Sequence, residues 1–145
     1  MTPAVFEQRN RYKGTPPRPW VRLRFRASDG STQEMELVAD TGNPCAVILS
    51  RAKMSQLQHL RGPILNTNFG PLGGGWLRLA LPEVGLVQDL LGYASDTVVS
   101  ATQLSSLDFE GLAGLPLLQL VEYGGDANWF WLRPAPSLPS KQVTP

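Results

Sequence analysis

The sequence predicts a mostly β, barrel-like domain that contains one or two short helices. Three observations favour this fold class. Apolar and polar residues alternate with a period of two along several short segments, glycine and proline clusters separate these segments, and only two stretches carry the spacing of a short helix. Many short strands separated by turns are typical of β barrels and sandwiches.

Length and composition limit what the chain can be. It has 145 residues, of which 42% are hydrophobic and 17% charged, as expected of one globular domain. No apolar run is long enough to span a bilayer and the first residues lack the apolar core of a signal peptide, so we expect a cytoplasmic protein without a membrane partner. A single cysteine, Cys45, excludes an internal disulfide, and one histidine, His59, adds too few ligands for zinc. We expect neither a metal nor another cofactor.

Prolines mark both ends of the chain. Eight of the 13 prolines lie in residues 1–19 and 134–145, and neither segment shows a hydrophobic period. We therefore expect an irregular Pro/Arg-rich N-terminal tail over 1–19, a folded body over 20–133, and a Pro-rich C-terminal tail over 134–145.

The folded body begins with a predicted β hairpin. In "VRLRFRA" (21–27) apolar residues alternate with arginines, the turn "SDGST" follows, and "QEMELVA" (33–39) alternates in return. If the loop has an odd number of residues, opposite charges face each other on one side of the hairpin and apolar side chains on the other. The expected pairs are Arg26 with Glu34, Arg24 with Glu36, Phe25 with Met35, and Leu23 with Leu37.

The basic residues are unevenly distributed along the chain. Seven of the 13 lie before position 27, although the net charge is only +1. A basic arm for nucleic acid is one interpretation of such a cluster. Pairing with glutamates across the hairpin gives several of these arginines a structural role instead, so we expect no nucleic-acid partner.

The remaining elements are predicted from local patterns. The segment "AVILS" (46–50) is typical of a buried strand, and Ser50 can cap a helix over 51–60 in which Met54, Leu57 and Leu60 share one face. Residues 66–84 predict two strands joined by a glycine-rich hairpin. Further strands are expected at "LVQDLLGYA" (86–94), "TVV" (97–99) and "NWFWLRP" (128–134), and a short helix is expected in "GLPLLQLV" (114–121).

Asp40 is the strongest candidate for a chemical role. It directly follows the apolar residues of 37–39 and begins the tripeptide Asp40-Thr41-Gly42 between two predicted strands. A carboxylate delivered by an apolar strand must be paired or put to use, because an unpaired buried charge is costly.

Three segments occur in an order that resembles the retropepsin-like aspartic proteases. The segment "ELVADTGNPCAVILS" (36–50) resembles the active-site segment of that family. Leu112-Ala113-Gly114 followed by "LPLLQL" resembles a second segment, which passes behind the active-site loop, and "NFGPLGGGW" (68–76) lies where the family has a mobile hairpin, the flap. The resemblance covers about residues 20–133 and implies a retropepsin-like single-lobe acid-protease barrel.

The resemblance implies a homodimeric aspartic endopeptidase that cleaves a peptide or protein substrate. Two neighbouring carboxyl groups that share a proton can activate water and donate to the peptide carbonyl. The chain has one Asp-Thr-Gly and no internal repeat, so a complete site takes Asp40 from two chains across a twofold axis. By resemblance, Thr41 hydrogen-bonds across that axis and the Gly42 amide approaches the carboxylate, which a side chain at this position would obstruct.

The resemblance also implies substrate contacts from the flap. Gly73, Gly74 and Gly75 would form a hairpin tip that closes over the substrate and excludes water, with a plain loop as the alternative interpretation. Trp76 would shield the cleft or simply pack. In viral members the chain ends pair to build the dimer sheet, and the strand at 128–134 is the candidate for that role here.

Two residues depart from the family pattern. Asn43 and Pro44 stand where the family usually has alanine and then a small or acidic residue. The Asn43 amide could donate a hydrogen bond to the ionised form of Asp40 and extend activity to lower pH, or it could obstruct a substrate position. A non-catalytic dimerisation or peptide-binding module that retains the fold is therefore an alternative. A Cys45 nucleophile would need a histidine base, and nothing marks His59 as that partner.

Overall fold

The structure is a computed structural model that describes residues 6–68, 70–103 and 109–136. Its strands are β1 (Gln8–Arg11), β2 (Trp20–Arg26), β3 (Thr32–Asp40), β4 (Val47–Leu49), β5 (Leu60–Arg61), β6 (Leu65–Thr67), β7 (Gly70–Leu81), β8 (Leu86–Ala94), β9 (Gly111–Gly114), β10 (Val121–Gly125) and β11 (Trp129–Pro134). The helices are α1 (Arg51–Leu57), α2 (Asp96–Thr102) and α3 (Leu115–Leu118), with a 3₁₀ turn, η1, at Pro82–Val84.

Six strands close into a barrel within the described residues. Neighbouring strands follow the order β2-β3-β9-β4-β8-β7, and β7 pairs back with β2. Fully buried side chains from several strands fill the interior, among them Leu23, Phe25, Leu37, Leu77 and Leu79. The predicted mostly β, barrel-like class with short helices is confirmed.

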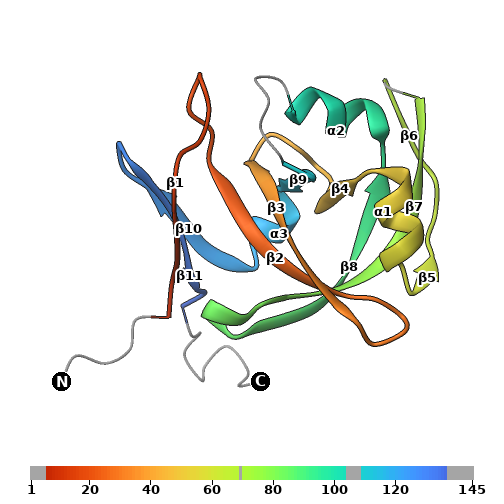
Figure 1. Ribbon diagram of the computed structural model, residues 1–145, viewed down its shortest axis with the longest axis horizontal. Coiled ribbons are helices and arrows are strands. Elements are labelled where there is room, and N and C mark those ends of the chain that lie inside the picture. Colours follow the sequence, from red (N-terminus) through yellow and green to blue (C-terminus); the bar gives the residue numbers. More distant parts are fainter. Residues whose placement is uncertain (1–5, 69, 104–108, 137–145) are drawn as a thin grey trace, which may run out of the picture.

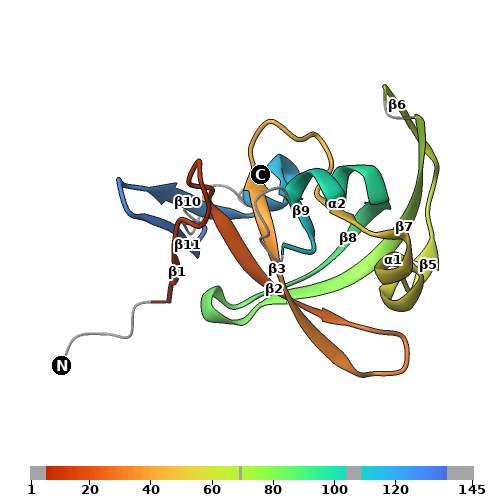
Figure 2. The same cartoon turned by 45° about the horizontal axis from the view of Figure 1, so that its top comes forward.

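The connections on one side of the barrel gather at the same end of the molecule. The loop between β3 and β4, helix α2, and the hairpin of β6 and β7 all lie at the top of Figure 1 and remain together in the rotated view of Figure 2. The hairpin between β1 and β2 rises beside them. This end of the barrel carries the candidate site.

The N-terminal segment is part of the fold. The prediction of an irregular tail over 1–19 is wrong for the part that the structure describes, because β1 pairs antiparallel with β11 and Lys13 pairs with Arg18. β11 also pairs with β10, so it lies at the centre of a three-stranded sheet. Both edges of β11 are therefore paired within one chain. This leaves the strand no free edge for the pairing between chains that was predicted for 128–134. Residues 137–145 of the predicted C-terminal tail lie outside the described residues.

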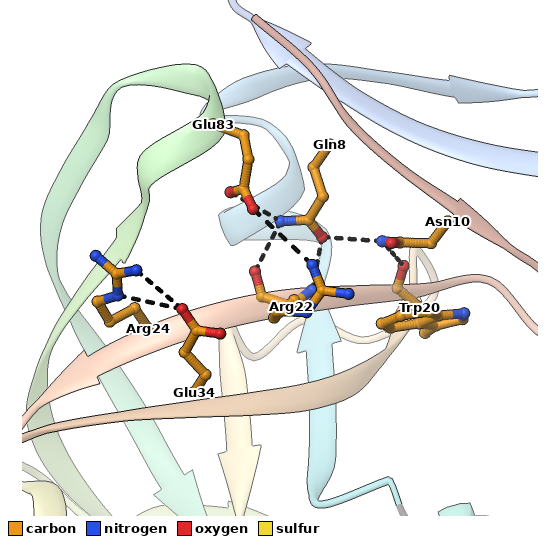
Figure 3. Close-up of polar contacts among 7 residues, drawn as sticks. All are labelled: Gln8, Asn10, Trp20, Arg22, Arg24, Glu34 and Glu83. Carbon is orange, nitrogen blue, oxygen red and sulfur yellow. Dashed lines mark hydrogen bonds and ion pairs between the residues drawn. The ribbon is translucent and has the colours of Figure 1, made fainter.

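Two buried amides connect this small sheet to the barrel (Figure 3). The Gln8 side chain donates to the Arg22 carbonyl at 2.9 Å and accepts from the Arg22 N–H at 2.6 Å. Asn10 donates to the Gln8 side-chain oxygen at 2.9 Å and to the Trp20 carbonyl at 3.1 Å. Glu83 accepts a further bond from Gln8. The strand was missed from the sequence because its inward-facing residues are polar and satisfied by backbone groups, so the hydrophobic alternation that reveals a strand is absent.

The first hairpin has the predicted strands but a different register. The observed pairs are Arg24 with Glu34, Arg22 with Glu36, Leu23 with Met35, and Val21 with Leu37. The loop spans 27–31, where the expected register required 27–33. Asp29 closes this shorter turn by accepting hydrogen bonds from the Ser31 N–H and hydroxyl, and Gly30 supplies the positive φ of 89°. A shift of two residues leaves every side chain on its predicted face, and Arg24 forms an ion pair with Glu34 (Figure 3).

Helix α1 is shorter than predicted. The Ser50 side chain accepts from the Lys53 N–H at 3.2 Å, as expected of the cap. Gln58 is extended and ends the helix at Leu57, so only Met54 and Leu57 form its buried face. Leu60 belongs to β5 instead and is 66% exposed.

Helix α2 replaces the strand predicted at 97–99. The Ser95 side chain accepts from the Val98 N–H at 3.2 Å and begins the helix, whose buried residues are Val99 and Thr102. Threonine and valine favour strands by propensity, but an N-terminal cap and burial of one helical face outweigh that weak preference.

Two of the three arginines of β2 lie close to carboxylates, in agreement with the strand-face interpretation. Besides the Arg24–Glu34 pair, Arg22 lies 3.9 Å from Glu83.

Among the described residues, no helix has the length and apolar character needed to cross a membrane.

We predict that Gln8→Ala destabilises the fold by about 1–3 kcal/mol, because the substitution removes the side-chain partner of the Arg22 N–H and carbonyl and one of the two acceptors of the buried Asn10 amide. Urea unfolding followed by tryptophan fluorescence measures the change. Gln56→Ala is the matched control, since Gln56 is exposed on α1 and its loss should change stability by less than about 0.5 kcal/mol. Equal effects of the two variants would show that the Gln8 contacts do not anchor β1.

Candidate functional site

Asp40 is the last residue of β3 and lies half-buried where the barrel opens. Its carboxylate oxygen Oδ1 accepts a hydrogen bond from the Gly42 N–H at 2.9 Å. A Cβ atom on Gly42 would lie 3.3 Å from the same oxygen, which is a tight contact. The turn that follows β3 therefore holds the carboxylate in one orientation by a backbone donor.

β9 lies directly behind this turn. It is inserted between β3 and β4, parallel to β3 and antiparallel to β4, with Asp40 opposite Gly114 in the register. The Gly114 N–H donates to the Ala46 carbonyl and the Leu115 N–H donates to the Asn43 carbonyl, both at 2.9 Å. The loop after Asp40 is thus bonded to the start of α3 by two backbone hydrogen bonds.

Gly114 permits this close approach. A Cβ atom there would overlap the carbonyl oxygen of Cys45 and lie 2.7 Å from that of Asn43. Glycine is therefore required by packing, since the φ of this residue is an ordinary −98°. The short helix predicted after it is present as α3, with Pro116 in its first turn.

A cleft of about 710 Å³ opens next to Asp40. Its floor comes from the end of β3, the loop 42–45 and β9. Most of its lining side chains are apolar, and Asp40 is at the boundary between this apolar surface and solvent. A volume of this size accommodates several side chains of a bound peptide or a small ligand. The apolar lining residues include Val38, Ile48, Leu65, Leu72, Val98 and Leu112.

Two walls of the cleft were not foreseen. Arg18 and Pro19, which the sequence placed in an irregular tail, line it from the hairpin between β1 and β2. Thr97, Val98 and Ala101 line it from α2, the helix predicted as a strand. No sequence signal pointed to Arg18, whereas the Ser95 cap could have revealed the helix and hence its cleft-facing side.

The hairpin at the position of the flap forms the third wall. Leu65, Thr67 and Leu72 of β6 and β7 line the cleft. The turn of this hairpin lies between Thr67 and Gly70, which pair with each other, so the prediction that residues 73–75 form its tip is wrong. The backbone hydrogen bonds between β7 and β8 continue through Gly73, Gly74 and Gly75, so these glycines lie inside the strand.

The glycines and tryptophan of this segment lie elsewhere. Gly73 and Gly74 line a separate cavity between α1 and the outer side of the hairpin. Gly75 and Trp76 pair with β5 and β8, and Trp76 is 40% exposed outside the described lining of the cleft. The structure does not bring these four residues to Asp40.

The two residues that flank Gly42 make different contacts. Thr41 is exposed in the turn after β3 and does not line the cleft of the single chain. Asn43 lines the cleft, and its side-chain oxygen accepts from the Cys45 N–H at 2.8 Å. This side-chain bond of Asn43 therefore stabilises the loop itself, rather than joining Asn43 to Asp40.

Cys45 is buried in the cleft wall, and this burial raises the pKa of its thiol. A raised pKa lowers the thiolate fraction at neutral pH, which is unfavourable for a nucleophile. His59 lies exposed with its ring nitrogen 2.6 Å from the Arg26 carbonyl. Within the described ranges, no three histidine, cysteine or acidic side chains gather in a way that could hold a metal ion.

Comparison with known proteins yields no relative for this chain: no family model, no curated protein and no solved structure matches it. The function of the site must therefore be argued from its geometry and chemistry.

We predict that Gly114→Ala destabilises the protein by about 1–3 kcal/mol, because the added methyl group displaces the loop that carries Cys45 and Asn43. Urea unfolding measures the loss. Gly73→Ala is the matched control, since a Cβ atom there meets nothing within 4 Å. If both variants unfold at the same urea concentration, the close approach of Gly114 to the loop does not require glycine.

Proposed function

We propose that the chain is one half of an aspartic endopeptidase, in which Asp40 from each of two identical subunits forms a catalytic pair. The observation that carries this proposal is the position of Asp40, held by the Gly42 N–H at the mouth of an apolar cleft. The turn after β3 backed by β9 and α3, and a hairpin over the cleft, agree with the order of segments that resembles the retropepsin-like proteases.

Two carboxyl groups facing each other across a twofold axis share one proton, because both cannot ionise at short distance. The ionised Asp40 of one subunit accepts a proton from water as that water attacks the peptide carbonyl. The protonated Asp40 of the other donates its proton to the carbonyl oxygen. Collapse of the tetrahedral intermediate breaks the C–N bond, and the leaving amine takes the proton that was removed from water.

The chain requires a partner for this chemistry. Among the described residues that line the cleft, Asp40 is the only carboxylate. A single carboxylate cannot serve as general base and general acid in the same step, and a C₂ dimer supplies the second at no cost in sequence.

The apolar cleft suits an extended peptide. A substrate strand can lie against the inner side of the β6–β7 hairpin and place alternate side chains in the cleft. Closure of the hairpin would exclude water from the reacting bond. The walls formed by Leu65 and Leu72 would then contact the substrate directly.

A non-catalytic peptide-binding module is the second candidate, and the cleft volume alone favours it as strongly as it favours a protease. This alternative uses the same apolar walls and makes no demand on the Asp40 carboxylate. The two functions predict different effects of replacing the Asp40 carboxylate: a protease loses cleavage, whereas a binding module keeps its binding.

We predict that Asp40→Asn lowers the rate of peptide cleavage by at least about 10²–10⁴-fold, because an amide can neither accept the proton from water nor donate one to the carbonyl. Cleavage of a peptide library is measured between acidic and neutral pH. The amide oxygen can still accept from Gly42, so the fold should be retained by circular dichroism. Asp89→Asn is the control, since Asp89 pairs with Arg78 on the exposed β7–β8 ladder. Undiminished cleavage by Asp40→Asn would refute the proposed chemistry, and absence of cleavage by the unaltered chain would favour the binding module.

We predict a homodimer by analytical ultracentrifugation, with two subunits contributing to each site. Mixing equal amounts of unaltered and Asp40→Asn chains, after exchange of subunits, should reduce activity per unaltered chain to about one half, because only about one quarter of dimers carry two carboxylates. Activity per unaltered chain that is independent of mixing would show that one chain suffices.

A further inference from the structure

The cleft that contains the candidate acid also contains a cation. Among the described lining residues, Arg18 and Asp40 are the only side chains with a formal charge at neutral pH. Arg18 is half-buried and comes from the hairpin between β1 and β2, whereas the rest of the lining is apolar or neutral.

The backbone of Arg18 is fixed close to Asp40. Arg18 exchanges two hydrogen bonds with Lys13, at 2.8 and 3.1 Å. The next residue, Pro19, accepts from the Ala39 N–H at 3.0 Å, and Ala39 immediately precedes the acid. The hairpin therefore continues the β2–β3 ladder to the end of β3 and brings Arg18 to the carboxylate end of the cleft.

The hairpin that carries Arg18 is also rigidly supported. The Lys13 ammonium lies 3.9 Å from the centroid of the Trp20 ring, in a cation–π contact. Trp20 is buried and donates from its indole nitrogen to the Arg11 carbonyl at 2.6 Å. Because the backbone that carries Arg18 is already ordered, less conformational entropy is lost when the cation binds a ligand.

The Arg18 side chain spans the cleft wall toward α2. Its Nη1 donates to the Thr102 carbonyl at 3.2 Å, in the last turn of that helix. Within the described residues, no carboxylate lies in ion-pair distance of Arg18, although Arg9, Arg22, Arg24, Arg78 and Arg133 each have one. A guanidinium has five N–H donors, and the bond of Arg18 to Thr102 uses one of them.

We propose that Arg18 is a specificity-determining residue that selects peptide ligands carrying a carboxylate close to the bond at Asp40. The carboxylate is an aspartate or glutamate side chain or the C-terminal carboxylate of the peptide. The planar guanidinium matches a carboxylate with two parallel hydrogen bonds, and the apolar walls strengthen that pairing by excluding water. This inference rests on the proposed peptide-binding function of the cleft and goes beyond it by naming the class of peptide.

The test measures binding to the full-length Asp40→Asn chain, so that cleavage does not consume the probe. The probes are short fluorescent peptides of apolar residues with blocked ends, in which a single glutamate is moved along the sequence. A second set has glutamine in place of glutamate, and a third has a free C-terminal carboxylate and no acidic side chain. Fluorescence anisotropy gives the dissociation constants.

We expect glutamate to strengthen binding at one or two positions only. Adding Arg18→Gln should weaken binding of those peptides by about tenfold to a hundredfold, the range for a charge-assisted hydrogen bond, and leave the glutamine set within about twofold. Adding Arg18→Lys should recover part of the preference, since charge is retained without the planar fork. Adding Arg61→Gln is the matched control, because Arg61 is exposed and lines the separate cavity behind the hairpin.

Selective binding of the third set alone would also support the proposal and identify the terminal carboxylate as the ligand. A glutamate preference that survives Arg18→Gln, or no preference in the parent, would overturn it. The two proposals can fail separately. If Arg18→Gln abolishes carboxylate-selective binding and the unaltered chain cleaves no peptide, the catalytic role of Asp40 is refuted and the specificity role of Arg18 is upheld. Failure of all peptides to bind would overturn the proposal for Arg18, whereas the catalytic role of Asp40 is decided by the cleavage assay on the unaltered chain.

Discussion

Two backbone hydrogen bonds fix the loop after Asp40 against the start of α3, from Gly114 to Ala46 and from Leu115 to Asn43. They form only because position 114 lacks a side chain, so that β9 can press against the loop from behind. β9 is at the same time the strand that joins β3 to β4 in the barrel. The contact thus couples closure of the barrel to the place where the Asp40 carboxylate lies, and the floor of the cleft depends on it.

The walls of the cleft are built by three elements that meet only in the folded chain. The β6–β7 hairpin and α2 supply apolar surface, and the segment between β1 and β2 supplies the cation. Apolar walls make each charge in the cleft more effective than the same charge in water, because there is less solvent to screen it. In the same surroundings burial raises the pKa of the Cys45 thiol, so this residue remains a neutral part of the wall.

Much of the barrel could be predicted because its strands are amphipathic. The alternation in 21–27 fixed which side of β2 faces inward even though the register was two residues off, since a shift by two preserves every face. Asp40 and Gly114 were found from local patterns: an acid after an apolar run, and a glycine at the entry to a short helix. The structure places both in one site, whereas the catalytic role of Asp40 stays a prediction.

The residues whose structure was predicted wrongly or missed share a physical cause. Gln8 and Asn10 are buried through hydrogen bonds to backbone groups that lie 10 to 14 residues away in sequence, which no local pattern can reveal. The glycines of 73–75 suggested a turn, but the ladder with β8 continues through all three. Two of them instead leave room for neighbours that are distant in sequence: a Cβ atom on Gly74 would overlap the Pro63 carbonyl, and one on Gly75 would overlap the Gln58 side chain. Arg18 belongs to the cleft only through the fold of the hairpin around it. Long-range contacts decided each of these positions.

The attachment of β1 to β11 has a consequence for the history of the chain in the cell. β1 leads into the hairpin that lines the cleft, while its own partner, β11, is the last strand in the described part of the chain. During synthesis the barrel strands leave the ribosome before that partner does, so β1 can form its ladder only after residues 129–134 have emerged. Proteolytic loss of β1 would remove one partner of β11 and the bonds of Gln8 and Asn10 to β2, but none of the strand pairings that close the barrel.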